Sequence, residues 1–200
     1  MSTELVFEKL SGGAIAHRLM ELAQLRITVF REWPYLYEGT LANEAEYLQS
    51  YIDCPRSLVV LVWDGARCVG ASTCLPLADA HAEMRQPFEV AGMDLARIDY
   101  FGESVLLPEY RGRGLGVAFF KHREDHARSL GLDLCAFCAV DRDPCDRRKP
   151  AGYAGNDSFW EHRGYFRQPQ LHCSFSWLDL GETEKSSKNM TFWLRQLPLA

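Results

Sequence analysis

Residues 105–116 read Val-Leu-Leu-Pro-Glu-Tyr-Arg-Gly-Arg-Gly-Leu-Gly and lead directly into the helical pattern 117–130. The apolar segment ends at Pro108, and glycines follow at every second position: Gly112, Gly114 and Gly116. Without side chains there, backbone N–H groups can close on an anion at the helix N-terminus, where unpaired donors and the helix dipole favour negative charge. Arg111 and Arg113 add positive charge. The stretch therefore predicts a phosphate-binding or pyrophosphate-binding loop.

Two widespread phosphate-binding motifs do not fit this stretch. A P-loop needs a longer loop ending in Gly-Lys-Ser/Thr, and the dinucleotide fingerprint needs a glycine where Val117 stands, with an acidic partner about 20 residues later. What remains is Arg-x-x-Gly-x-Gly after an apolar strand and Pro-Glu-Tyr. This combination resembles the coenzyme A pyrophosphate loop of the GNAT superfamily of N-acetyltransferases. A glycine-rich turn with a purely structural role is the alternative.

The composition fits one domain over residues 1–200, with 47% hydrophobic residues to fill a core. Lys and Arg number 22 against 27 Asp and Glu, a net charge of −5, and no long basic run favours nucleic acid. The first residues lack the features of a signal peptide, and no apolar run reaches the roughly 18 residues of a membrane span. We therefore expect a cytoplasmic protein with neither a nucleic-acid nor a membrane partner.

The seven cysteines are odd in number and unevenly spaced. Without an export signal this pattern predicts reduced thiols. Cys135-Ala-Phe-Cys138 is a CxxC motif, but it lies in an apolar strand pattern and has no second ligand pair at zinc spacing. We therefore expect no metal site.

Hydrophobic periodicity and turn residues predict alternating strands and helices. The first helix has a repeating face: Ile15, Leu19, Leu22, Arg26 and Val29. A hairpin around Asp64-Gly65 has the clearest local pattern. The expected elements are a strand at 4–10, helices at 15–31 and 41–52, strands at 57–63 and 67–75, a short helix and loop within 78–96, a strand at 98–107, the long helix to 130, a strand at 132–140, a short helix at 157–163, and strands at 173–178 and 190–194.

This order of elements also resembles the GNAT fold, and Phe-Trp-Glu-His-Arg-Gly-Tyr at 159–165 is similar to that family's Leu-Tyr-x-x-x-Gly-Phe element. The resemblance implies an α/β fold (an α+β mixed sheet) of the GNAT acyl-CoA N-acyltransferase type, with a central splayed β-sheet flanked by helices. It further implies that strands 98–107 and 132–140 part, with the pantetheine arm of acetyl-CoA in the gap. Acetyl-CoA is then the expected co-substrate.

The resemblance assigns the cofactor contacts residue by residue. Backbone groups of residues 105–107 would pair with the pantetheine, and amides of residues 111–116 would hold the pyrophosphate. The predicted cofactor-binding residues are Val105, Leu106, Leu107, Arg111, Gly112, Arg113, Gly114, Leu115, Gly116, Asn156, Phe159 and Trp160.

Acetyl transfer needs a neutral amine, and a primary alkylamine has a pKa of about 10.4, so a base should assist. The two-residue period of the strand at 98–107 places five residues on one face: Asp99, Phe101, Glu103, Val105 and Leu107. Glu103 is the first candidate base and Asp99 the second, unless these carboxylates only pair with an arginine. A backbone N–H near Leu106 or Leu107 would polarise the thioester carbonyl.

The family often has a tyrosine at the position of Trp160, where its phenol can protonate the departing thiolate. The indole N–H of Trp160 donates a hydrogen bond but is no useful acid, so this residue is expected to be a packing wall. Tyr153, seven positions earlier, is the candidate general acid.

For the acceptor, the resemblance implies a site shaped partly by the loop between the first two helices. Trp33, Tyr35, Tyr37 and Glu38 lie there, and aromatic rings beside a carboxylate suit a cationic amine. The same aromatics would otherwise pack the helix joint. The basic run 147–149 offers an alternative site for an acidic acceptor or the 3′-phosphate of CoA, or else a solvated charge cluster.

The sequence thus predicts an acetyl-CoA-dependent N-acetyltransferase that acts on a primary amine of a small molecule or a protein. The alternative is a CoA-binding sensor or interaction module of the same fold. Assembly as a homodimer is left open.

Overall fold

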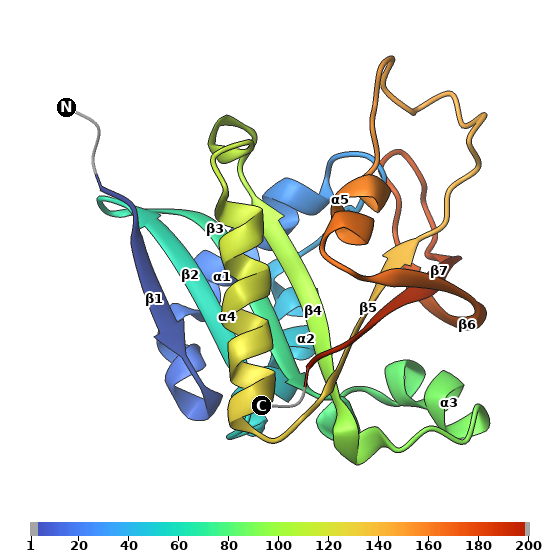
Figure 1. Ribbon diagram of the computed structural model, residues 1–200. Helices are drawn as coiled ribbons and strands as arrows, with labels where there is room; N and C mark the ends of the chain where they lie inside the picture. The colour runs from blue at the N-terminus through green and yellow to red at the C-terminus, as the bar shows by residue number, and fades with distance from the viewer. Residues whose placement is uncertain (1–3, 199–200) are drawn as a thin grey trace.

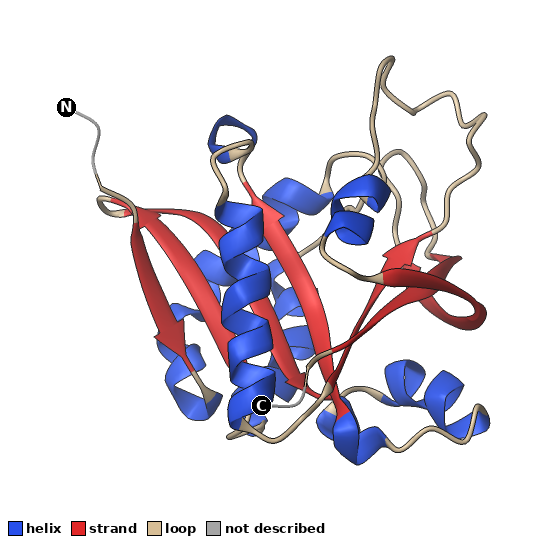
Figure 2. Cartoon of the chain, viewed as in Figure 1, coloured by secondary structure: helices blue, strands red, loops and turns tan. Residues whose placement is uncertain are grey.

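A computed structural model describes residues 4–198, which form a seven-stranded mixed sheet with helices on both faces (Figure 1, Figure 2). The strands are β1 (Val6–Leu10), β2 (Leu58–Asp64), β3 (Arg67–Pro76), β4 (Ile98–Leu106), β5 (Leu134–Val140), β6 (Phe166–Trp177) and β7 (Ser186–Gln196). The α-helices are α1 (Leu19–Phe30), α2 (Leu41–Asp53), α3 (Ala82–Val90), α4 (Leu115–Ser129) and α5 (Asp157–His162). The strand order is β1-β2-β3-β4-β5-β7-β6. This architecture confirms the predicted fold class.

Most predicted elements form close to their expected bounds. The hairpin turns at Gly65, whose φ of 58° lies in the left-handed region that glycine adopts readily. The first helix differs, because residues Gly12–Arg18 form a 3₁₀ helix before α1 begins. The last two strands are also longer than expected. Their outer residues are polar and exposed, so the sequence pattern resembled a loop there.

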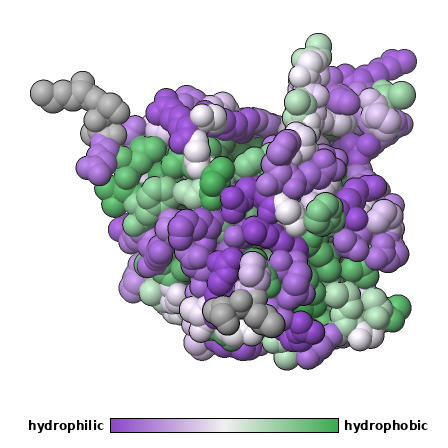
Figure 3. All heavy atoms as spheres, viewed as in Figure 1, coloured by the Kyte–Doolittle hydropathy of each residue, from purple (hydrophilic) through white to green (hydrophobic). Residues whose placement is uncertain are grey.

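The helices cover the sheet from two sides. Helix α1 packs on β3 and β4, with α2 against α1, and α4 lies across the opposite face over β2, β3 and β4 (Figure 1). Polar side chains cover the outer surface of α4 and the loop between β5 and α5 (Figure 3). No helix within residues 4–198 combines the length and apolar character needed to cross a bilayer.

Strands β4 and β5 are parallel neighbours over one short segment. Ile98, Asp99 and Tyr100 pair with residues 134–136, and the strands then diverge toward their carboxyl ends (Figure 1). On its other edge β5 pairs with β7 along its whole length, from Leu134 to Val140. The sheet is therefore splayed, and its gap opens beside the glycine loop at the start of α4.

A β-bulge in β4 changes which side chains face the gap. Ser104 pairs with Ser72 on β3, whereas Phe101 pairs with Cys74, so β4 carries one residue more than its partner between these points. Phe101 packs on Phe120 of α4, but Glu103 contacts Arg26 of α1. The prediction that Asp99, Phe101, Glu103, Val105 and Leu107 share one face is therefore wrong, because it assumed an unbroken two-residue period.

Candidate active site

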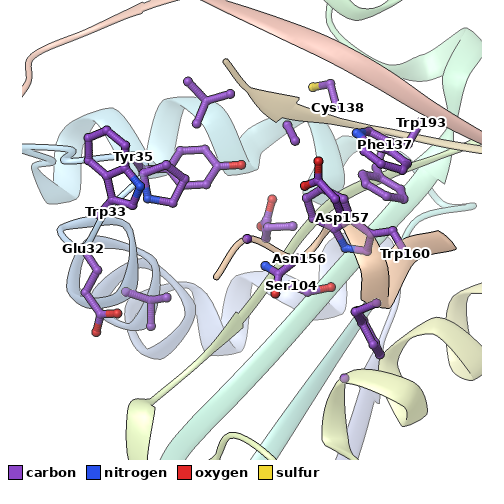
Figure 4. Close-up of a pocket in the computed structure, with 18 of the residues that line it drawn as sticks. Glu32, Trp33, Tyr35, Ser104, Phe137, Cys138, Asn156, Asp157, Trp160 and Trp193 are labelled. Atoms are coloured by element: carbon purple, nitrogen blue, oxygen red, sulfur yellow. The ribbon is translucent and has the colours of Figure 1, made fainter. Parts of the chain in front are cut away.

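The gap between β4 and β5 opens into a cavity of about 1570 Å³ (Figure 4). This exceeds the roughly 300–1,000 Å³ of a pocket for one drug-sized ligand, so two reactants fit together. Its wall includes these predicted site residues: Glu103, Leu106, Arg111, Gly116, Tyr153, Asn156, Phe159 and Trp160. The remaining predicted residues lie outside the wall in the described structure: Asp99, Val105, Leu107, Gly112, Arg113, Gly114 and Leu115.

The glycine loop borders this cavity, since Arg111 and Gly116 at its two ends are both wall residues. Gly112 and Gly114 have φ of 72° and 81°, and a methyl group added to either would meet nothing within 4 Å. Gly114 is the N-cap of α4, and the amide of Ala118 donates to its carbonyl. The amides before Ala118 therefore stand outside the helical ladder at an uncovered N-terminus, an arrangement suited to an anion.

Gly116 lies beside α5. A Cβ on this residue would lie 3.4 Å from Cζ of Phe159, an ordinary van der Waals contact. The ring of Phe159 in turn contacts Phe120 at 5.7 Å between centroids. The guanidinium of Arg113 lies over the ring of Tyr110 at 5.0 Å.

At the end of β4, the backbone groups of Leu106 face the gap and the amide of Leu107 does not. The amide of Leu107 donates to the carbonyl of Val69 on β3 at 3.0 Å, so the sheet already uses it. Bonded and non-bonded pairs alternate along an antiparallel ladder, which directs the N–H and C=O of Leu106 away from β3. Nε of Arg111 donates to the Leu106 carbonyl at 3.1 Å. Of the two N–H groups predicted to polarise a carbonyl, Leu106 therefore fits and Leu107 does not.

Glu103 lies at the cavity wall within a buried network. Its Oε2 forms an ion pair with Nη1 of Arg26 at 2.6 Å and accepts a hydrogen bond from the Tyr47 hydroxyl at 3.3 Å. Its Oε1 is buried and has no hydrogen-bond partner in residues 4–198. Arg26 also pairs with Glu44 of α2. The pKa of Arg26 lies well above its ordinary value, because Glu103, Tyr47 and Glu44 together outweigh the opposing effect of burial.

Asp99 lies on the opposite face and is fully buried. Burial raises the pKa of its carboxyl to about 7, an effect that the nearby Cys74 and Arg123 oppose. Within the described residues neither carboxylate oxygen accepts a hydrogen bond, and Asp99 does not line the cavity. The prediction of Asp99 as a second base is therefore wrong for this cavity, because the bulge turns it toward α4.

Aromatic residues form the cavity walls on both sides (Figure 4). The indole of Trp160 packs between Phe137 and Trp193, at 5.0 and 5.1 Å between ring centroids. Across the cavity, Tyr153 meets Trp33 edge to face at 6.3 Å. Burial raises the pKa of Tyr153.

Comparisons with known proteins place this geometry in a family. The model of the acetyltransferase (GNAT) family matches residues 19–149, well over half of the chain. The chain belongs to the GNAT acetyltransferase family. No curated protein matches the chain in a sequence comparison.

Solved structures resemble this GNAT protein over nearly its whole length. A ribosomal-protein-alanine N-acetyltransferase from Brucella melitensis has a TM-score of 0.60 at 13% identity, covering 96% of this chain and 99% of its own. A GNAT-family acetyltransferase from Streptococcus pneumoniae has a TM-score of 0.59 at 12% identity, with 97% and 100% covered. An acetyltransferase from Thermus thermophilus has a TM-score of 0.56 at 16% identity, with 98% and 99% covered. At these identities the likeness concerns the fold.

The cavity wall includes part of the set predicted for the acceptor. Trp33 and Tyr35 line it (Figure 4), whereas Tyr37 and Glu38 lie outside its wall in the described structure. Tyr37 forms an isolated bridge with Asp179, and Glu38 pairs with Arg31 at 2.5 Å. Tyr37 and Glu38 were predicted at the acceptor site, but they do not line the cavity because the chain turns away from it after Leu36.

Two residues of the basic run 147–149 have different surroundings. Arg148 pairs with Asp146 at 2.7 Å and with Asp179 at 3.0 Å, so it anchors its own loop, while Lys149 lines the cavity. Within residues 4–198 no group of three or more potential metal ligands comes together.

Sequence reasoning missed Arg142, which holds the loop between α1 and α2 in place. Its guanidinium donates to the carbonyls of Pro34 at 2.7 Å and Tyr35 at 2.6 Å, and it pairs with Asp179 at 2.7 Å. The partners are about 40 to 110 residues away in sequence, so no local pattern indicated them.

Proposed function

We propose that this GNAT-family protein transfers an acetyl group from acetyl-CoA to a primary amine of a small molecule or a protein. One observation carries the proposal: the uncovered glycine loop and the gap-facing backbone of Leu106 border the same large cavity. An anion site next to an exposed strand edge suits a ligand with a pyrophosphate at one end and an amide-containing arm at the other.

The described residues fit such a ligand, since Gly112 and Gly114 leave open space where side chains would stand. Amides of residues 112–116 and the side chain of Arg111 would hold the pyrophosphate, with Leu106 pairing to the arm. Asn156, Phe159 and Trp160 would form the facing wall. When bound, acetyl-CoA supplies the acetyl group as an activated thioester.

Three groups of this chain would then take part in the acetyl transfer. The N–H of Leu106 would polarise the carbonyl, as a fixed donor does in an oxyanion hole. Glu103 Oε1 would receive a proton from the acceptor nitrogen, directly or through water. The Tyr153 hydroxyl would donate a proton toward the departing sulfur.

Two measurements on the purified protein test the proposal. Acetyl-CoA at 100-fold over its Kd should raise the free energy of unfolding by about 2.7 kcal/mol, and release of free thiol should follow addition of a suitable amine. Gly114→Glu should weaken acetyl-CoA binding at least 100-fold, because a carboxylate would stand where the pyrophosphate binds.

Gly131→Glu is the matched control. Gly131 lies beyond the other end of α4 and also has a positive φ, 73°, with nothing within 4 Å of an added Cβ. A glutamate at position 131 should therefore meet the same unfavourable positive φ as one at position 114, while leaving the glycine loop unchanged. Equal binding by wild type and a folded Gly114→Glu protein would overturn the loop assignment. Binding without turnover on any amine would instead favour a CoA-binding module.

A further inference from the structure

Three charged side chains from three elements form one buried cluster beside the cavity. Arg26 of α1 lies between Glu44 of α2 and Glu103 of β4, and contacts a carboxylate oxygen of each. The three residues are 7%, 1% and 5% exposed, respectively. The guanidinium also lies over the rings of Phe30 and Tyr47, at 5.1 and 4.2 Å. Packing and pairing on every side hold this arginine in one place.

The cluster has an unbalanced charge. Two carboxylates and one guanidinium sum to a net charge of −1. A buried charge without a partner is costly, so a net negative cluster next to a cavity favours a cation within it. The extra charge comes from Glu44, which does not line the cavity in the described structure.

The two oxygens of Glu103 have different surroundings. Oε2 forms an ion pair with Arg26 and accepts a hydrogen bond from Tyr47, whereas the buried Oε1 has no hydrogen-bond partner among residues 4–198. Glu103 is a wall residue, and the rings of Phe30 and Tyr35 line the same part of the cavity. A carboxylate oxygen among aromatic rings is a favourable site for an ammonium group.

Most arginines of the cavity wall are already paired with carboxylates of their own, and Lys149, which also lines the cavity, belongs to the loop between β5 and α5. Arg111 pairs with Glu32, Arg142 with Asp179 and Arg167 with Asp141. Arg123 donates to the backbone carbonyls of Glu103 and Phe119, from the side of the sheet that α4 covers.

We propose that the acceptor site selects a cation, a primary alkylammonium, and that Glu44 and Arg26 are the residues that set this selectivity. Arg26 holds Glu103 by one oxygen so that the other faces the ligand, and Glu44 neutralises Arg26 so that the charge of Glu103 acts on the ligand. The inference rests on the proposed function for identifying this ligand as the acetyl acceptor.

Equilibrium binding tests the proposal without turnover. The protein is saturated with CoA, which carries no acetyl group, and titrated with n-butylammonium chloride or with the neutral isostere 1-butanol. Wild type should bind the ammonium at least tenfold more tightly. Glu44→Gln brings the cluster to zero net charge and should weaken ammonium binding about tenfold, while 1-butanol binding stays within twofold.

The matched control is Glu46→Gln, the same change on the same helix at an exposed position. It should leave both affinities unchanged. Glu103→Gln serves as a second neutralising variant if Glu44→Gln does not fold, with the same loss of preference expected. Equal binding of the two probes by wild type, or an equal loss for both in Glu44→Gln, would overturn the proposal. Preserved ammonium preference without acetyl transfer to any amine would count against the proposed function alone.

Discussion

Glu103 and Tyr153 face the same cavity from opposite sides of the splayed sheet, one on β4 and one in the loop after β5. Their surroundings differ. Glu103 is fixed by Arg26 and Tyr47 at a single oxygen, while Tyr153 is held by an edge contact with Trp33. Both side chains line one cavity, so the proposed transfer would have a carboxylate as proton acceptor and a phenol as proton donor.

We expect Glu103→Gln to lower kcat/KM at pH 7 by about 100-fold, the lower end of what a general base contributes. The loss should shrink as the pH approaches the amine pKa of about 10.4, where the acceptor needs no base. Rates measured from pH 6 to 10 check this, with Glu46→Gln as the control. A pH–rate profile parallel to that of wild type would remove Glu103 from the role of base.

Tyr153→Phe removes one hydroxyl and keeps the ring that packs on Trp33. If this hydroxyl protonates the departing thiolate, kcat should fall by about 100-fold while the Kd for acetyl-CoA stays unchanged. Steady-state kinetics and a binding titration on the same preparation separate the two effects. Tyr35→Phe, on another ring of the wall, is the comparison. An unchanged kcat in Tyr153→Phe would mean that the reaction proceeds without this acid.

At the scale of the element, the bulge in β4 decides which carboxylate serves the cavity. Gly102 and Glu103 both turn toward α1 and α2, and a Cβ on Gly102 would lie 1.9 Å from the hydroxyl of Tyr51. Only glycine leaves room for that buried tyrosine. The bulged segment of β4 therefore packs closely against α2, which is far away in sequence.

Sequence patterns predicted the elements that depend on local signals. The turn at Gly65, the glycine loop before α4 and the order of strands and helices all follow from neighbouring residues. The bulge does not, because the residue that packs against it, Tyr51, lies some 50 residues earlier. A strict two-residue period therefore assigned Asp99 to the cavity and gave it the wrong face.

The buried cluster left one signal in the sequence. Arg26 falls within the apolar repeat of the first helix, at a position that faces the core. A charged residue there needs a buried partner. Its partners, Glu44 and Glu103, became identifiable only when α2 and β4 were placed beside α1.

At the scale of the whole molecule, separate segments enclose the acceptor side of the cavity through shared polar contacts. Arg142 ties the loop after α1 to Asp179, and Lys188 of β7 also pairs with Asp179 at 3.2 Å. Trp177 of β6 donates to the Tyr35 carbonyl at 3.1 Å. The C-terminal hairpin thus holds rings of the cavity wall in place, so the terminal strands support the cavity as well as the sheet.

The stability of the whole molecule should depend on pH through Asp99. Burial raises the pKa of this carboxyl from its ordinary value to about 7 in the folded protein. Between about pH 4 and pH 7 the folded chain keeps the proton that the unfolded chain has lost. The contribution of Asp99 to stability is therefore most favourable at low pH and falls as the pH rises through this window.

Asp99→Asn should remove that dependence. Relative to wild type, the variant should gain about 3 kcal/mol more free energy of unfolding at pH 8 than at pH 5, because a neutral amide carries no charge to desolvate. Urea unfolding at both pH values checks this. Asp133→Asn is the control: a hydrogen bond from Arg97 lowers the pKa of Asp133 below its ordinary value, so its contribution is constant over this range. The same stability change for Asp99→Asn at both pH values would show that Asp99 is ionised in the folded protein throughout, with Arg123 near enough to offset its burial.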